Sequence, residues 1–380
     1  MSWKEIINQE KIKIFFQKVL KEKTLSNAYC FFGIEGVGKF ALALNIIKTY
    51  SCLQPKIEGD FLEPCEGCSN CLSIRSLKFP NVEYIFSLPS FKTQEKEGDS
   101  IYSSLSDSVI EEMNSKLRNK INNPYVKFAI EGANQIRIAQ IRELRKSLAL
   151  SNSFPGRKFI VIFNAEDMRV EAQNAFLKTL EEPREDITFF LLTTRRESLL
   201  PTILSRCQSI FFPPLSDDEV FFYLIRNFNK SENELRIVSR FANGSITKAI
   251  ELVESNLKET RDYLVNILRF ALKKELPGKQ LIESIEKFAE NLDKKGAQSC
   301  LQLLANWIRD AILLTQNGTN NLIVNLDDLD TLKRFSEKFG NKPLGSAIEI
   351  IENCNLMINS NVQIPNVFIN LFLELRKLLL

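Results

Sequence analysis

The sequence of 380 residues contains no histidine. This absence excludes Ser-His-Asp triads, histidine general bases and metal sites that need an imidazole ligand. Any metal site in this chain must therefore use cysteine or carboxylate ligands.

Long apolar runs and a strong net charge are also missing. No stretch reaches about 18 consecutive apolar residues, so neither a membrane span nor a signal peptide is expected, and a cytoplasmic location follows as the default. The 50 basic and 47 acidic residues leave a formal charge of +3, so any contact with DNA should be local. A content of 44% hydrophobic and 26% charged residues is typical of a globular protein with two or three domains.

Half of the eight cysteines gather in one short segment. Cys52 is followed after twelve residues by Cys65, Cys68 and Cys71, which form two overlapping C-x-x-C pairs. Such pairs let two thiolates reach one tetrahedral Zn²⁺ with bonds of about 2.3 Å, and four thiolates close the coordination sphere. The segment predicts a structural zinc site, and redox use of the C-x-x-C pairs is the less favoured alternative.

Strands alternate with helices through the first 212 residues, which predicts an α/β domain with a parallel, helix-flanked sheet. Apolar runs typical of strands lie at residues 28–32, 82–86, 158–163, 188–193 and 208–212. Residues 88–123 are polar and Ser-rich and predict an insertion with an amphipathic helix at 106–121. After Pro213 and Pro214 the periodicity is helical to the C-terminus.

A glycine-rich loop follows the first predicted strand. Residues 33–40 (GIEGVGKF) match G-x-x-x-x-G-K-[ST] through Lys39, but Phe40 replaces the hydroxyl residue. In this pattern the loop N–H groups hold phosphates, the lysine reaches the terminal phosphates and the hydroxyl binds magnesium. Gly33, Gly36, Gly38 and Lys39 are therefore candidate nucleotide-binding residues in a degenerate loop. A glycine turn that binds no nucleotide is the alternative.

Further motifs resemble those of a known family. They are Asn8-Gln9, residues 26–29 (SNAY), residues 174–183 (NAFLKTLEEP), Thr193-Thr194 and residues 204–207 (LSRC). In order and spacing these motifs, over about residues 1–255, resemble the gamma/tau/delta-prime group of bacterial clamp-loader subunits, a branch of the AAA+ P-loop proteins.

The resemblance implies three domains. Residues 1–213 would form an AAA+ domain with a five-stranded parallel sheet, a zinc module at about 51–75 and the insertion at about 88–123. Residues 214–256 would form a small helical lid domain. Residues 257–380 would form an all-helical collar domain for oligomerisation.

Three departures distinguish two kinds of subunit in that group, an ATP-hydrolysing motor and a subunit that is usually a poor or inactive nucleotide binder. The motor has Asp-Glu where this chain has Phe163 and Asn164, and an arginine where it has Thr247. The loss of the hydroxyl at Phe40 and of the strand acid at Phe163 removes both protein contacts that place magnesium. The three departures favour a subunit that is not an ATPase by itself.

Two alternatives stay open. Glu166 and Asp167, just after the strand, or Lys248 beside Thr247, would restore some of the lost contacts in a divergent ATP-hydrolysing gamma/tau-type motor that uses Lys39. A zinc-stabilised scaffold without a role in replication is the other alternative.

The motif around Arg206 is intact. In clamp loaders this arginine projects into the nucleotide site of a neighbouring subunit, so the resemblance implies a catalytic role for Arg206 in trans as an arginine finger. A salt-bridged surface arginine is the alternative. The resemblance also implies a hetero-pentamer with gamma/tau and delta subunits, within a DNA polymerase III holoenzyme, that opens the sliding clamp and loads it on primed DNA. It implies structural Zn²⁺ as cofactor and leaves ATP binding by this chain open.

Overall fold

The computed structural model describes residues 2–89, 105–149, 154–181, 186–254, 257–273, 275, 278–290, 292–316 and 323–380. Residues 90–104 of the predicted insertion and residues 182–185, which include the last two residues of the NAFLKTLEEP motif, lie outside them. The chain forms two compact units, Met1–Phe228 with Ala242–Ile250, and Asn229–Phe241 with Glu251–Leu380. The division into three domains stays a prediction.

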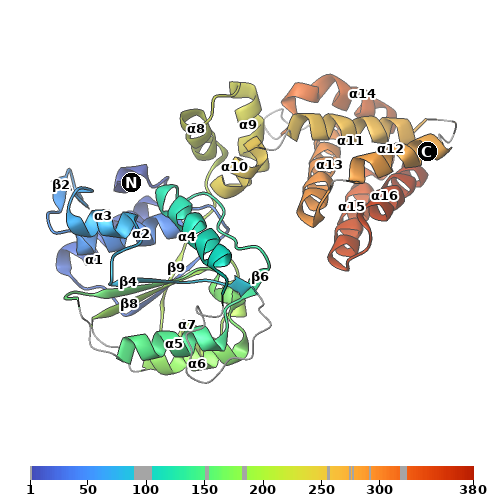
Figure 1. Ribbon diagram of the computed structural model, residues 1–380. Coiled ribbons are helices and arrows are strands. Elements are labelled where there is room, and N and C mark those ends of the chain that lie inside the picture. Colours follow the sequence, from blue (N-terminus) through green and yellow to red (C-terminus); the bar gives the residue numbers. More distant parts are fainter. Residues whose placement is uncertain are drawn as a thin grey trace. The chain divides into compact units, whose positions relative to one another are not determined.

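A five-stranded sheet forms the centre of the first unit (Figure 1). Its strands are β1 (Ala28–Phe32), β4 (Val82–Ile85), β7 (Lys158–Ile162), β8 (Ile187–Thr193) and β9 (Gln208–Phe211). Every neighbouring pair is parallel, in the order β4-β7-β8-β1-β9. Every residue of β7 and β8 is buried, which explains why their sequences are apolar runs without alternation. The predicted five-stranded parallel sheet is confirmed.

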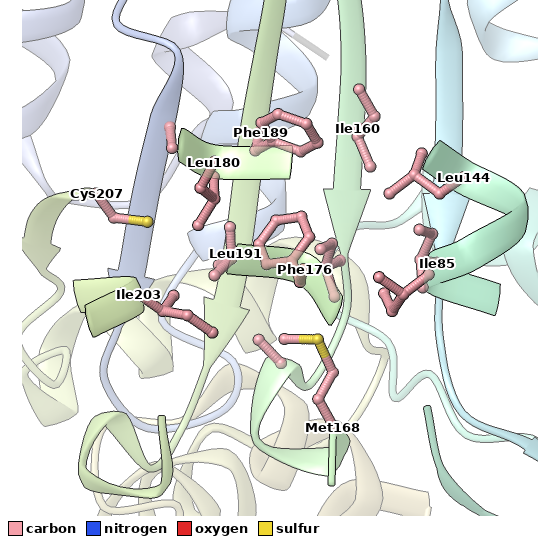
Figure 2. Packing of buried hydrophobic residues seen from close by; sticks show 14 of the residues in the cluster. Ile85, Leu144, Ile160, Met168, Phe176, Leu180, Phe189, Leu191, Ile203 and Cys207 are labelled. Atoms are coloured by element: carbon pink, nitrogen blue, oxygen red, sulfur yellow. The ribbon is translucent and has the colours of Figure 1, made fainter. Parts of the chain in front are cut away.

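Helices cover both faces of this sheet. On one face lie α1 (Glu10–Glu22) and α2 (Lys39–Ser51), and on the other lie α5 (Ile138–Ala149) and α6 (Val170–Glu181) (Figure 1). Figure 2 shows the apolar core beneath the second pair, where the ring of Phe176 on α6 meets Phe189 on β8 at a centroid distance of 5.3 Å. Leu144 on α5 reaches the same core beside Ile85 and Ile160.

Smaller elements complete the first unit. The cysteine segment contains an antiparallel hairpin of β2 (Lys56–Glu58) and β3 (Phe61–Glu63), followed by α3 (Ser69–Arg75). A second antiparallel pair, β5 (Leu88–Pro89) and β6 (Ala133–Gln135), flanks α4 (Asp107–Asn122). The remaining helices are α7 (Pro201–Leu204), α8 (Asp217–Asn227) and the first residues of α10 (Ile246–Glu254).

The second unit is all-helical where the structure describes it. It consists of the end of α10 with α9 (Glu232–Phe241), α11 (Leu257–Ala271), α12 (Gly278–Ala289), α13 (Lys294–Thr315), α14 (Leu329–Phe339), α15 (Leu344–Asn359) and α16 (Ile364–Leu379). Helix α13 packs against α11, α14 and α15 and forms the centre of the unit. Among the described residues, no helix is long and apolar enough to cross a membrane.

Candidate functional site

The glycine loop joins β1 to α2, as the sequence predicts, and its glycines are required by close packing. Gly33, Gly36 and Gly38 have φ angles of +146°, +81° and +99°, which favour glycine. A Cβ on Gly36 would lie 2.5 Å from the backbone nitrogen of Thr247 at the start of α10, and one on Gly33 would clash with the carbonyl of Phe212. The chain's own backbone thus requires these two glycines, whether or not a phosphate binds.

The side chain of Lys39 forms hydrogen bonds with the backbone of its own glycine loop. Its Nζ donates to the carbonyl oxygens of Gly33 at 2.5 Å and Ile34 at 2.7 Å. The side chain is buried, and burial lowers the pKa of Lys39 to about 8 despite the opposing charges of Glu166 and Glu35. The ammonium that would reach a terminal phosphate is held by backbone carbonyls in this structure.

Aromatic rings fill the place where magnesium ligands would lie. Phe40 and Phe163 stand at the two positions where the motor pattern has its hydroxyl and its strand acid, and their ring centroids are 4.9 Å apart. Phe128 packs on Phe163 at 4.7 Å, and Tyr84 lies against both Phe40 and Phe163. The three phenylalanine rings are hydrocarbon, so the two positions that carry metal ligands in the motor pattern offer no oxygen to a hard cation.

The cavity beside the loop is small. It holds about 50 Å³ and is lined by the glycine loop, Lys120, Pro124, Phe128, Phe163 and Asn164, among others. Ordinary small-molecule pockets hold about 300 to 1,000 Å³, so this cavity lies well below that range.

A short segment covers the loop. We call residues 120–128 the cover segment; it begins in the last turns of α4 and continues to Phe128. Within it, the hydroxyl oxygen of Tyr125 accepts from the backbone N–H of Ile7 at 3.0 Å, and the carbonyl oxygen of Tyr125 accepts from Thr247 Oγ1 at 2.5 Å. The segment therefore ties the N-terminal residues, the loop and α10 together.

Lys120 of the cover segment is also buried. Its Nζ donates to the carbonyl of Val126 at 2.6 Å and lies 5.9 Å from the ring centroid of Phe40. Burial lowers the pKa of Lys120 to about 8. No candidate site residue is predicted from the sequence in this part of the chain; the signal that it offers is the mostly apolar stretch at residues 124–130, soon after the helix.

The acidic residues after β7 have protein partners. Glu166 Oε1 accepts from the backbone N–H of Thr194 at 2.9 Å and from its hydroxyl at 2.5 Å. Burial would raise the pKa of Glu166, but the hydroxyls of Thr194 and Thr193 outweigh it and lower the pKa. Asp167 accepts from the hydroxyl of Ser87 at 2.7 Å. Neither carboxylate is among the residues that line the cavity.

The four predicted zinc ligands come together. The Sγ atoms of Cys52, Cys65, Cys68 and Cys71 all lie within 4.8 Å of one another; tetrahedral Zn²⁺ places thiolates about 3.8 Å apart. Backbone N–H groups of Cys65 and Cys68 donate to sulfur at 3.2 Å. Burial would raise the pKa of Cys68, but N–H donors from Cys71 and Leu53 lower it to about 6. The donor set therefore fits a structural zinc ion.

Arg206 lies apart from the glycine loop, on the turn after α7. Its side chain is 37% exposed, with Nη2 3.2 Å from Glu181 Oε1 and Nη1 donating to the carbonyl of Thr202 at 3.1 Å. Exposed ion pairs of this kind contribute about 0 to 1 kcal/mol, so the guanidinium can exchange this partner for a stronger one.

The parallel sheet, the glycine loop and the following helices define a protein of the AAA+ P-loop class. A family model described as DNA polymerase III, delta subunit, matches residues 8–216, and another, described as its C-terminal part, matches residues 268–380. The chain belongs to this family.

Individual relatives agree with that assignment. The DNA polymerase III subunit delta' of Bacillus subtilis is 25% identical over 381 residues, which cover 99% of each chain. The tau subunit of the same organism is 24% identical, over 92% of this chain and 57% of its own. A solved gamma subunit-related protein from Thermotoga maritima covers 97% of this chain and 98% of its own at 17% identity, with a TM-score of 0.42. The family models and the Bacillus subtilis delta' subunit confirm the resemblance to clamp-loader subunits.

Proposed function

We propose that this chain is the non-hydrolysing, delta-prime-like subunit of a DNA polymerase III clamp loader. It would join gamma/tau and delta subunits in a cytoplasmic hetero-pentamer that opens the sliding clamp and loads it on primed DNA. The full-length match to a delta' subunit supports this assignment. In this proposal Zn²⁺, held by the four clustered cysteines, has a structural role.

One observation carries the non-hydrolysing part of the proposal, the packing of Phe40 on Phe163 at 4.9 Å. Metal ions neutralise the charge that develops in phosphoryl transfer, and catalysis depends on their placement. The two rings occupy the positions of both lost ligands, while Glu166 and Asp167 accept hydrogen bonds from the hydroxyls of Thr194 and Ser87. The small cavity and the cover segment also support a chain that does not hydrolyse ATP.

The trans-acting part rests on Arg206. Its guanidinium is exposed and held by one surface carboxylate and one carbonyl. The guanidinium group is planar, permanently charged and offers paired N–H donors that suit phosphate oxygens. In this proposal Arg206 exchanges its ion pair with Glu181 for contacts with the nucleotide of a neighbouring subunit.

Reconstitution with motor and delta subunits tests both parts. Arg206→Ala should lower the DNA-stimulated ATPase of the complex, because an arginine finger contributes about 10³- to 10⁵-fold to the rate at the site that it serves. Arg206→Lys should recover little of the ATPase activity, because lysine keeps the positive charge but lacks the paired N–H donors of the guanidinium. Arg145→Ala on α5, another exposed arginine, is the matched control and should leave turnover unchanged.

The isolated chain should not hydrolyse ATP. Turnover by the purified chain that Lys39→Ala abolishes would establish the motor alternative instead. An unaltered ATPase in the Arg206→Ala complex would refute the trans-acting role, and failure to assemble with the other subunits would favour a scaffold outside replication.

A further inference from the structure

The all-helical unit contains a cavity that the proposed function does not use. It holds about 220 Å³ and lies between α11 and α14, with Trp307 of α13 among its lining residues. Both helices pack on α13, so α13 forms the floor between them. An apolar cavity of about 150 Å³ binds benzene, so this one has room for a single aromatic or large aliphatic side chain.

The floor of the cavity consists of aromatic rings packed on one another. Trp307 and Phe335 meet edge to face at a centroid distance of 4.9 Å, and Phe339 packs on Phe335 at the same distance. Trp307 is 1% exposed, and its indole N–H donates to Asp328 at 2.9 Å. Leu268 of α11 completes this surface.

The rim of the cavity is cationic. Arg269, Arg334 and Lys338 line it, all three are exposed, and no carboxylate is among the lining residues. Arg269 donates to the amide oxygen of Asn266, and the ammonium of Lys338 lies over the ring of Phe339. Among the residues that the structure describes, no ion pair joins any of these three cations to a carboxylate.

We propose that this cavity binds an acidic peptide segment of a partner protein, which inserts one aromatic side chain between α11 and α14 while its carboxylates meet Arg269, Arg334 and Lys338. Arginine clusters recognise acidic motifs in this way, and a buried aromatic side chain supplies the anchor. This inference is independent of the proposed function.

The geometry favours a peptide over single-stranded DNA. Nucleic acid would require exposed aromatic faces on which successive bases stack. Trp307, Phe335 and Phe339 are each less than 10% exposed, so the cavity offers one recess for one side chain. Arg269 on α11 and Arg334 and Lys338 on α14 place cations on both helices that border the recess, where carboxylates on either side of the anchor can meet them.

The test uses the full chain and fluorescein-labelled pentapeptides. Asp-Asp-Phe-Asp-Asp is the probe, and Asp-Asp-Ala-Asp-Asp and Lys-Lys-Phe-Lys-Lys are its controls. By fluorescence anisotropy, the probe should bind at least tenfold more tightly than either control. Its affinity should fall as salt rises, because the Debye length shrinks from about 10 Å at 0.1 M to about 3 Å at 1 M.

Charge reversal on the rim locates the site. Arg334→Glu and Lys338→Glu should each weaken binding of the probe at least fivefold. Lys333→Glu makes the same change at an exposed residue of α14 that does not line the cavity, and should leave binding unchanged. Equal binding of all three peptides, or equal losses in all three variants, would overturn the proposal. So would a dT oligonucleotide that binds more tightly than the probe and is lost with the same two rim variants.

Discussion

The rings of Phe40 and Phe163 pack with their centroids 4.9 Å apart and their planes at 46°. Phe40 begins the helix after the glycine loop, and Phe163 directly follows β7, so the contact joins positions more than a hundred residues apart. The sequence presents them as two separate losses of a metal ligand. In the structure they form one apolar contact, so restoring either oxygen ligand alone would place a polar group against the other ring.

A double-mutant cycle should detect this contact. Phe40→Ala and Phe163→Ala should each lower the free energy of unfolding by about 3 to 5 kcal/mol, because each leaves a cavity. The double variant should lose about 0.5 to 1.5 kcal/mol less than the sum, the energy of the ring contact. Urea unfolding measures all four proteins. Phe40→Ala combined with Phe176→Ala, which lies in the core on the other face, should be additive; the same coupling there would contradict a local contact.

Tyr125→Phe should loosen the cover segment without changing the shape of the ring. The substitution removes the oxygen that accepts from the N–H of Ile7. A buried donor left unpaired costs about 1 to 3 kcal/mol, so amide exchange at Ile7 should accelerate about tenfold or more. Hydrogen exchange with mass spectrometry provides the measurement.

A neighbouring tyrosine supplies the control for that experiment. Tyr223→Phe also removes a partly buried hydroxyl, which bonds to Asn123, but leaves the acceptor for Ile7 in place. Exchange at Ile7 should therefore be unchanged in Tyr223→Phe. Equal protection in both variants would show that Tyr125 does not hold the N-terminal segment.

Lys120→Met should stabilise the protein at neutral pH, and the gain should shrink in alkali. Burial lowers the pKa of Lys120 from 10.5 to about 8, so the folded state carries a protonation penalty of up to about 3 kcal/mol below pH 8. Between pH 8 and 10.5 the unfolded state holds the proton more tightly, so the wild-type stability rises with pH as this penalty disappears. The lost bond to Val126 offsets about 1 kcal/mol of the gain.

Thermal unfolding from pH 7 to 10.5 checks the sign of this effect. Lys116→Met is the control, since Lys116 lies on the same helix but is only partly buried and pairs with Glu112 at 2.7 Å. It should give no stabilisation that depends on pH. A gain for Lys120→Met that stays constant or grows across this range would contradict the burial argument.

The sequence predicts the sheet well because its strands are short apolar runs bounded by glycine, proline and amphipathic helices. It also predicts the cysteine cluster, since C-x-x-C spacing constrains the backbone locally. It does not predict the cover segment, because Tyr125 meets Ile7 and Thr247 through tertiary contacts that no local pattern encodes. The β2–β3 hairpin is not predicted for a different reason: β2 has only three residues and is exposed throughout, so it is too short to show the alternation over four to eight residues that marks a half-buried strand.

Removal of zinc should unfold the cysteine module and leave the central sheet intact. The purified chain should contain one Zn²⁺ per molecule, and Cys68→Ser should reduce that content at least tenfold, because the closed site loses one of four thiolates. Hydrogen exchange should then accelerate over β2, β3 and α3, while β7 and β8, whose residues are all buried, keep their protection. Cys354→Ser, a buried cysteine of the other unit, is the control and should keep its zinc. Full zinc content in Cys68→Ser, or loss of protection in β7 and β8 on chelation, would contradict a structural site confined to this module.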